Sequence, residues 1–226
     1  MIKKIKEIEF GYLIKIDYSF FIFLPFYLFL FFTRKERKDI KNFKNRKRKI
    51  QFISSRIVAK FSIYQYLKSK GEKVKYKKIE IKKEKKGNVY GFFKNKEINI
   101  SISHTDGISV CACGGYNRIG IDIEKSSKNI NKIAKKILSE EEIRKTKKVP
   151  LISIWCVKEA TSKALGSGFK FSPKNIFIQE VYDGKFKVKL KGKYLSNFTE
   201  FENKEIQIET FKKYNYIFAF CNIGDN

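Results

Sequence analysis

Residues 120–124, Gly-Ile-Asp-Ile-Glu, and residues 155–163, Trp-Cys-Val-Lys-Glu-Ala-Thr-Ser-Lys, decide the fold of this chain. The first stretch alternates between apolar and polar residues, which predicts a strand with Asp122 and Glu124 on one face. The second stretch has helical spacing, and a helix-sized interval separates the two. We therefore expect one strand and one helix whose polar side chains meet.

On the predicted helix, Trp155, Glu159 and Lys163 lie roughly on one stripe. Together with Lys158 and the two strand carboxylates they form a set of three carboxylates and two ammonium groups. This set suits a divalent cation that holds a polyphosphate. Either segment alone is typical of a polar strand edge or a solvated helix face, so the prediction depends on their conjunction.

A third segment, Ser-Ile-Ser-His-Thr-Asp-Gly at residues 101–107, contains the only histidine of the chain. Ser103 and His104 end an alternating strand, and the following Thr-Asp-Gly is a turn sequence. A lone histidine is more often structural than catalytic. A hydroxyl and an imidazole at a strand end also suit phosphate binding.

In their order along the chain, residues 101–107, 120–124 and 155–163 resemble the 4′-phosphopantetheinyl transferases of the surfactin-synthetase-activating (Sfp-like) type. The resemblance runs from about Thr33 to Phe171. It implies holo-[acyl-carrier-protein] synthase activity: 4′-phosphopantetheine moves from coenzyme A to a serine of an apo carrier protein, giving holo carrier protein and 3′,5′-ADP. The carrier's pathway, whether fatty-acid, polyketide or peptide synthesis, stays open.

The resemblance also implies site residues. Asp122, Glu124 and Glu159 would hold Mg²⁺, with Glu159 as the base that takes the serine proton directly or through a metal-bound water. Lys158 and Lys163 would neutralise charge on the phosphates and on the leaving nucleotide, which makes Lys163 both catalytic and cofactor-binding.

Further contacts to coenzyme A are implied at four residues: Ser103, His104, Arg56 and Lys60. The last two follow the basic run at residues 46–49 and lie about one helical turn apart. A basic helix is also consistent with RNA binding or with simple solvation. The family commonly has Gly-Lys-Pro or Gly-Arg-Pro before the serine-histidine strand.

In this chain the corresponding segment is Gly87-Asn88-Val89, in which Asn88 replaces the lysine or arginine of the family motif. Lys85 or Lys86 would substitute for it, or coenzyme A would bind more weakly.

The expected fold is α+β, with two pseudo-symmetric lobes, each a small, mostly antiparallel sheet packed on a long helix, and the active site between the lobes. We place an N-terminal, nucleotide-binding lobe at residues 1–118 and a C-terminal, metal-binding lobe at residues 119–226. Together they form one transferase unit.

Local patterns predict the individual elements. Thr33 and Glu36 form a capping-box signature. Apolar residues from Ile50 to Leu67 recur every three or four positions, as in a helix. Residues 129–138 are expected to be helical, Ser139 to cap a short helix, and Leu151–Leu165 to be a helix. Strands are expected near residues 8–16, 74–81, 98–103, 108–113, 119–124, 175–180, 185–190, 205–210 and 215–221, with a hairpin-like connection at residues 114–118.

The chain has 226 residues, is 42% hydrophobic and has a formal net charge of +27. Such a charge indicates an anionic partner, or a biased composition rich in Lys, Ile, Asn and Phe. We expect the partner to be an acidic acyl or peptidyl carrier protein. The chain itself is expected to be a cytoplasmic monomer. Two alternatives to a transferase remain. The first is a nucleic-acid-binding module, although no recognition motif is visible. The second is a degenerate homologue that binds coenzyme A without transferring its phosphopantetheine group.

The four cysteines, at positions 111, 113, 156 and 221, include no Cys-x-x-Cys pair. With one histidine in the chain, this spacing argues against a zinc site. Buried, reduced thiols are expected.

An uncharged apolar run extends from Tyr18 to Phe32 and contains Pro25. It is shorter than the roughly 17–20 residues that a spanning helix needs. We expect a buried strand plus a connection, without membrane association. The alternative is a membrane interface, with cations from Arg34 onward binding anionic lipid.

Overall fold

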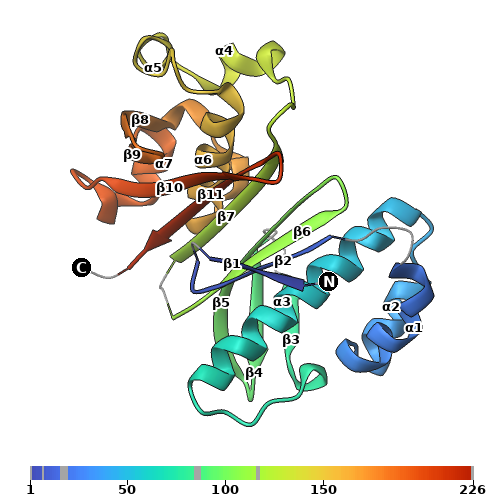
Figure 1. Ribbon diagram of the computed structural model, residues 1–226. Helices are drawn as coiled ribbons and strands as arrows, with labels where there is room; N and C mark the ends of the chain where they lie inside the picture. The colour runs from blue at the N-terminus through green and yellow to red at the C-terminus, as the bar shows by residue number, and fades with distance from the viewer. Residues whose placement is uncertain (1, 7, 16–19, 84–87, 116–117, 225–226) are drawn as a thin grey trace. The chain divides into compact units, whose positions relative to one another are not determined.

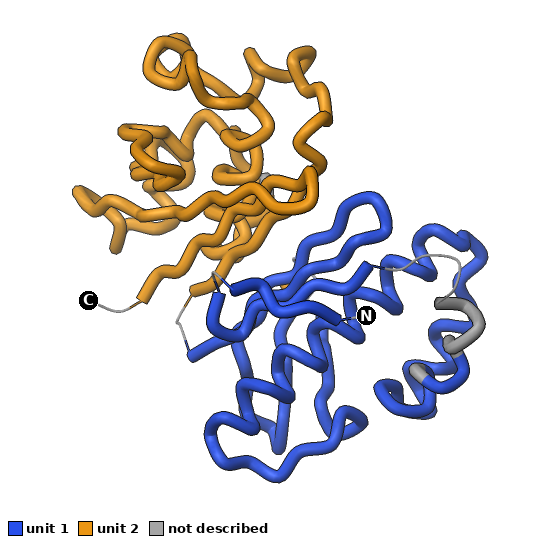
Figure 2. The backbone as a smooth tube through the Cα atoms, in the orientation of Figure 1, with its two compact units in different colours: residues 1–84, 89–115 blue, residues 85–88, 116–226 orange. Residues whose placement is uncertain are grey.

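The computed structural model describes residues 2–6, 8–15, 20–83, 88–115 and 118–224. The chain forms two compact units, shown in Figure 2: unit 1 contains residues 1–84 and 89–115, and unit 2 contains residues 85–88 and 116–226. Each unit has an antiparallel sheet and a long helix, so the expected α+β class is confirmed (Figure 1). The predicted division between residues 118 and 119 lies near the one at residue 116.

Unit 1 is built on a six-stranded antiparallel sheet in the order β1-β2-β6-β5-β4-β3. Its strands are β1 (Ile2–Ile5), β2 (Phe10–Lys15), β3 (Glu80–Lys83), β4 (Val89–Phe93), β5 (Lys96–Thr105) and β6 (Ile108–Cys113). Its helices are α1 (Phe20–Phe31), α2 (Arg34–Lys41), α3 (Arg46–Ser69) and the short η1 (Tyr76–Lys78).

The long helix α3 covers this sheet, packing mainly on β6, β2 and β5. Asn45 caps its first turn by accepting a hydrogen bond from the backbone of Arg48. Its buried side includes Ile53, Ile57 and Ile63, residues of the predicted periodic stripe or next to it, so the sequence prediction of this helix is confirmed.

Unit 2 has a five-stranded antiparallel sheet in the order β7-β11-β10-β9-β8. Its strands are β7 (Arg118–Lys125), β8 (Ile176–Tyr182), β9 (Lys185–Leu190), β10 (Ile206–Lys213) and β11 (Tyr216–Ile223). Its helices are η2 (Asn131–Ile133), α4 (Ala134–Ile137), α5 (Glu140–Lys145), α6 (Leu151–Ala164), η3 (Gly168–Lys170), η4 (Pro173–Asn175), α7 (Gly192–Asn197) and η5 (Thr199–Phe201).

The predicted buried strand within residues 18–32 is wrong. Residues 20–31 form the helix α1, with Pro25 inside it, while residues 18 and 19 lie outside the described part. Phe26 and Phe29 are 65% and 63% exposed, so this helix is not buried throughout. The capping box of Thr33 and Glu36, which begins α2 directly afterwards, is confirmed.

Three other predictions need correction. Within the expected strand at residues 74–81, Tyr76–Lys78 form a 3₁₀ helix and β3 begins only at Glu80, and β4 was not predicted. The hairpin-like connection at residues 114–118 does not join paired strands, because β6 and β7 belong to different sheets. The helix expected at residues 129–138 is divided into η2 and α4.

A close approach between β7 and α6 positions the polar side chains of unit 2. A Cβ atom added to Gly120 would lie 1.9 Å from the carbonyl oxygen of Ala160 and 2.8 Å from the backbone nitrogen of Ala164. Backbone atoms in a helix cannot yield as a flexible side chain can. Glycine at position 120 is therefore a requirement for this helix-to-strand packing.

We predict that Gly120→Ala destabilises the fold at the upper end of about 1–3 kcal/mol, the usual cost of overpacking, measured by urea unfolding. Gly224→Ala is the matched control, because an added Cβ there meets no atom within 4 Å. Equal stability of the two variants would contradict the close approach.

Candidate functional site

The carboxylates of the predicted metal set lie in unit 2 on two elements that pack together. Asp122 and Glu124 are on β7, and Glu159 is on α6, which packs on β7 and β11. Asp122 is buried, whereas the side chains of Glu124 and Glu159 keep 14% and 26% of their surface exposed. The structure thus brings together the strand and helix residues that the sequence pattern placed on one site.

Lys163 connects the strand to the helix in this site. Its ammonium nitrogen lies 2.8 Å from Asp122 Oδ1, 3.1 Å from the carbonyl oxygen of Ile121 and 3.9 Å from Glu159 Oε1. Lys128 forms a similar ion pair with Glu124. Two lysines therefore offset two of the three negative charges of these carboxylates.

The environment of Glu159 changes the proton affinity of its carboxyl group. Burial raises the pKa of Glu159, the positive charge of Lys163 opposes the rise, and the carboxylates of Asp122 and Glu124 add to it. A raised pKa makes a carboxylate a better proton acceptor near neutral pH. Its surroundings therefore favour proton binding by Glu159 more than those of a fully solvated carboxylate would.

The donor chemistry suits Mg²⁺, which prefers carboxylate oxygens together with water and phosphate oxygens. Within the described residues, no group of three His, Cys, Asp or Glu side chains is arranged to hold a metal ion. Mg²⁺ is usually bound by one or two carboxylates plus substrate phosphates rather than by an all-protein cage. An Mg²⁺ ion here would therefore need phosphate oxygens and water in addition to the carboxylates.

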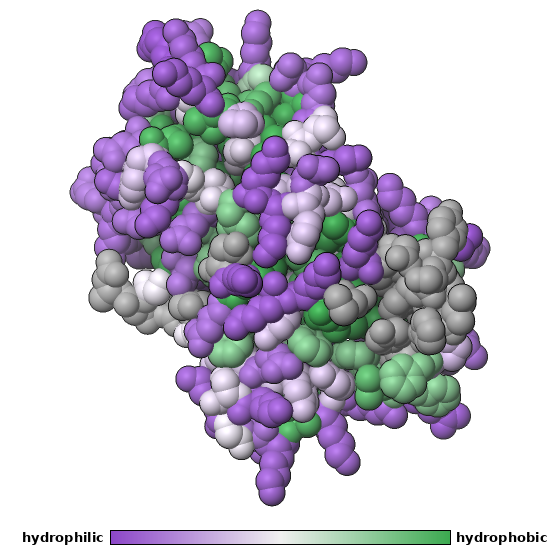
Figure 3. Space-filling model, viewed as in Figure 1, coloured by the Kyte–Doolittle hydropathy of each residue, from purple (hydrophilic) through white to green (hydrophobic). Residues whose placement is uncertain are grey.

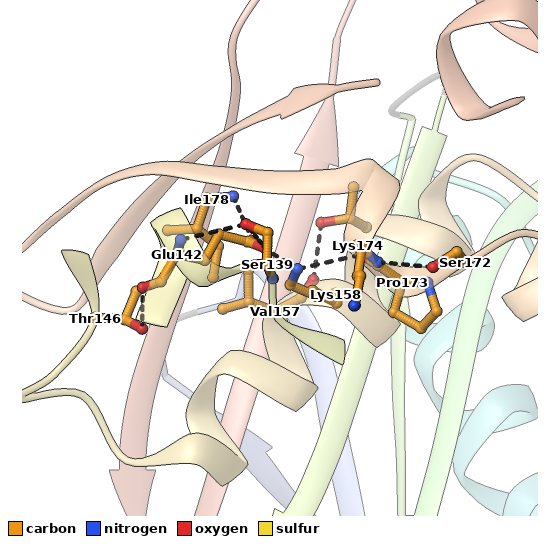
Figure 4. Close-up of polar contacts among 10 residues, drawn as sticks. Ser139, Glu142, Thr146, Val157, Lys158, Ser172, Pro173, Lys174 and Ile178 are labelled. Carbon is orange, nitrogen blue, oxygen red and sulfur yellow. Dashed lines mark hydrogen bonds and ion pairs between the residues drawn. The ribbon is translucent and has the colours of Figure 1, made fainter. Parts of the chain in front are cut away.

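Lys158, expected to contact phosphate, lies in a cluster of polar contacts with Glu142 and Pro173 (Figure 4). Its side chain is fully buried and donates to Glu142 Oε1 at 2.6 Å and to the carbonyl oxygen of Pro173 at 3.1 Å. Burial lowers the pKa of Lys158 to about 8, against the opposing charge of Glu142. Its ammonium group would have to leave Glu142 to reach a ligand, so we do not assign phosphate binding to Lys158.

Glu142 belongs to the same buried cluster and was not singled out as a site residue. It closes the capping box of α5 with Ser139, and its Oε1 also accepts from the backbone nitrogen of Ile178. The capping-box spacing was visible in the sequence, but its lysine partner lies 16 residues away.

Lys60, the expected ligand of the nucleotide 3′-phosphate, is also fully buried. It donates to Glu36 Oε2 at 2.8 Å and to the carbonyl oxygen of Phe31 at 2.9 Å. Burial lowers its pKa, which the charge of Glu36 opposes. This lysine joins α3 to the α1–α2 segment, so it too is left out of the phosphate site.

Arg56, one turn before Lys60, is partly buried, with its guanidinium 4.8 Å from the ring centre of Phe52. Burial lowers its pKa. Since no arginine loses its charge at neutral pH, Arg56 stays a candidate for anion binding in unit 1.

Ser103 and His104 lie at the end of β5, as predicted. Ser103 is buried, His104 is exposed, and the Asp106-Gly107 turn that follows has positive φ angles of 39° and 76°. This is the dihedral pattern of a two-residue hairpin turn. Because successive strand residues face opposite sides, the two side chains leave the sheet on different faces.

Trp155 packs against the hydrophobic core of unit 2, in agreement with a structural role. The four cysteines are buried free thiols, as expected. Burial raises the pKa of Cys111 and Cys221 to about 12.

Residues 118–221 match the family model of the 4′-phosphopantetheinyl transferase superfamily. The matched range begins at β7 and contains Asp122, Glu124, Glu159 and Lys163. It does not contain Arg56, Ser103 or His104, whose expected roles rest on the sequence resemblance alone. A search of curated proteins finds no match to this chain.

The buried ion pair of Lys158 and Glu142 gives a prediction for stability. Lys158→Met leaves an uncompensated buried carboxylate and should cost about 3–5 kcal/mol. The double variant Lys158→Met/Glu142→Gln should recover much of that loss in urea unfolding. The single variant Glu142→Gln completes the comparison. If the stability lost in the double variant equals the sum of the losses in the two single variants, the two residues are not coupled.

For Glu159, we predict that substitution increases stability at neutral pH, whereas substitution of Lys158 decreases it. A raised folded-state pKa supplies stability that is fully present below the unfolded value of about 4.3 and is lost as pH rises through the folded value. Glu159→Gln removes this loss, so its stability relative to the natural protein should increase as pH rises from 4 to 8. The control Glu141→Gln changes an exposed carboxylate that also pairs with a lysine four residues on. A Glu159→Gln variant that is less stable at pH 8 would show that the carboxylate has a stabilising role.

Proposed function

We propose that this protein is an Mg²⁺-dependent phosphopantetheinyl transferase that moves 4′-phosphopantetheine from coenzyme A to a serine of an apo carrier protein. The observation that carries the proposal is the cluster of Asp122, Glu124, Glu159 and Lys163 on β7 and α6, inside the range that matches the superfamily. The match supports phosphopantetheine transfer in general, and the cluster supplies the residues for it.

In the proposed reaction, the serine hydroxyl oxygen forms a bond to the β-phosphorus of coenzyme A. The bond from that phosphorus to the bridging oxygen breaks, and 3′,5′-ADP leaves with the electron pair. Glu159 accepts the serine proton, for which its raised pKa is suited. Bound Mg²⁺, held by Asp122, Glu124 and Glu159, would neutralise charge on the pyrophosphate.

Lys163 has the second role in the proposed reaction. Its ammonium group is fixed beside Asp122 and lies near Glu159, with 24% of its side chain exposed. A partly exposed cation held among carboxylates is available to a polyphosphate that arrives with its own metal ion. We propose that Lys163 stabilises the charge that develops on the leaving nucleotide.

In unit 1, we propose that Ser103, His104 and Arg56 contact the phosphates of coenzyme A. The exposed His104 at the strand end and the cation Arg56 on α3 support the proposal for these two residues, whereas Ser103 rests on the sequence resemblance. Lys85, Lys86 and Gly87 lie outside the described residues, so the substitute for the missing cation near Asn88 stays a prediction. The net charge of +27 favours an acidic carrier protein.

The test is incubation of the full chain with coenzyme A, Mg²⁺ and a panel of apo carrier proteins, with the mass of each carrier measured. We predict a mass gain of one phosphopantetheine group that requires Mg²⁺. Glu159→Gln should lower the rate at least about a hundredfold, as expected for loss of a positioned base, while the control Glu141→Gln should retain full activity.

Mg²⁺ with coenzyme A should also raise the melting temperature of the natural protein, since a ligand that binds the folded state stabilises it. Stabilisation without any mass gain on the carrier panel would favour the coenzyme A-binding homologue that lacks transfer activity. Absence of both effects would contradict the proposal.

A further inference from the structure

Helix α1 presents large apolar side chains to solvent. Phe26, Phe29 and Leu30 are 65%, 63% and 41% exposed, and the helix contains no charged residue. Figure 3 shows apolar side chains at the surface near the place where Figure 1 draws α1. Isolated exposed apolar residues are common on soluble proteins, but a cluster of them marks an interaction site.

A groove of about 850 Å³ lies beside this apolar face. Its apolar lining comes from Pro25, Leu28 and Phe29 of α1 and from Ile40 of α2. Cations from α2 and the first turn of α3 also line it: Arg34, Lys35, Arg37, Lys38, Lys41 and Lys49. Among the described residues that line the groove, none is acidic, so the apolar surface and the positive charge are adjacent.

Buried contacts hold this segment in place. Lys60 of α3 donates to the carbonyl oxygen of Phe31 and to Glu36, and Arg37 donates to the carbonyl oxygen of Phe32 at 2.9 Å. The pairing with Lys60 also neutralises Glu36, one of the two acidic residues of α2. The connection between α1 and α2 is therefore anchored on unit 1, and α2 keeps an excess of positive charge.

We propose that the α1–α2 segment is a peripheral docking element for the surface of an anionic phospholipid bilayer. The exposed aromatic side chains of α1 would enter the boundary between headgroups and acyl chains, and the cations of α2 would contact lipid phosphates. No helix in the described part of the chain is long and apolar enough to span a membrane. The proposed contact is interfacial, because exposed side chains of α1 and α2 make it, and it does not depend on the proposed transferase activity.

The combination of side chains favours a lipid surface over other anionic partners. A nucleic acid would use the cations and could stack bases on the aromatic rings, but it offers no apolar interior for Leu30 and Pro25. An acidic protein would also use the cations of α2. The uncharged α1 beside them adds an apolar surface, and apolar and basic surfaces side by side are typical of elements that bind a membrane interface.

The experiment is flotation of the full chain with vesicles of phosphatidylglycerol and phosphatidylcholine, compared with vesicles of phosphatidylcholine alone. We predict binding to the anionic vesicles only. Added salt should weaken the binding without abolishing it, because salt screens the lysine and arginine contacts but not the apolar insertion.

Two pairs of variants test the two components. Phe26→Ser/Phe29→Ser should weaken binding at least about tenfold, given the apolar area that is lost, and the weakening should persist at high salt. Lys35→Glu/Lys38→Glu should also weaken it at least about tenfold. All four side chains are exposed, so the melting temperature should not change.

The matched controls make the same changes in unit 2. Ile143→Ser/Tyr214→Ser removes two exposed apolar side chains, and Lys193→Glu/Lys204→Glu reverses two exposed charges. Neither should alter vesicle binding. The proposal is overturned if the protein does not bind anionic vesicles or if the control and test variants bind them equally. Polyuridylic acid serves as the nucleic-acid probe. The proposal is also overturned if the Lys35→Glu/Lys38→Glu variant loses binding to this RNA but not to the vesicles.

Discussion

The candidate site in unit 2 depends on how closely α6 approaches β7. Gly120 has no side chain, and the backbone of Ala160 occupies the place where a Cβ atom would be. This contact sets the helix at the height where Lys163 reaches Asp122. A helix displaced outward by one methyl group would separate the carboxylates of the strand from Glu159 and Lys163 of the helix, so a glycine without any chemical role determines the geometry of the polar cluster.

Buried lysines carry much of the structural organisation in this highly basic chain. Lys158 joins α6 to α5 through Glu142, and Lys60 joins α3 to α2 through Glu36. In both pairs the carboxylate is also the third helical residue of a capping box. A buried ammonium group needs a charged partner and further acceptors, and a capping glutamate beside a backbone carbonyl provides them. The same arrangement thus occurs in both units.

The polar cluster and the apolar α1 surface place different demands on the sequence. Around Glu159, burial raises a pKa that favours proton transfer but opposes the charged state in the folded protein. At α1, exposed phenylalanines are unfavourable in water and need a reason to be kept. In each place a feature that does not stabilise the isolated fold indicates a binding partner.

Alternation and helical spacing predicted most elements, because local side-chain periodicity determines which face of a strand or helix becomes buried. The sequence by itself therefore determined the strand with Asp122 and Glu124, the helix with Glu159 and Lys163, the α+β class and the capping box of Thr33 and Glu36. It failed for residues 18–32, where an apolar run does not distinguish a buried strand from a helix.

Only the tertiary structure decided which lysines are available to a ligand. Lys158 and Lys163 lie on the same helix and are chemically identical, yet the first faces Glu142 in the interior and the second faces Asp122 with part of its surface exposed. Their partners lie 16 and 41 residues away along the chain. Contacts over such separations depend on how elements pack, and local sequence patterns carry no information about which distant carboxylate will meet which lysine.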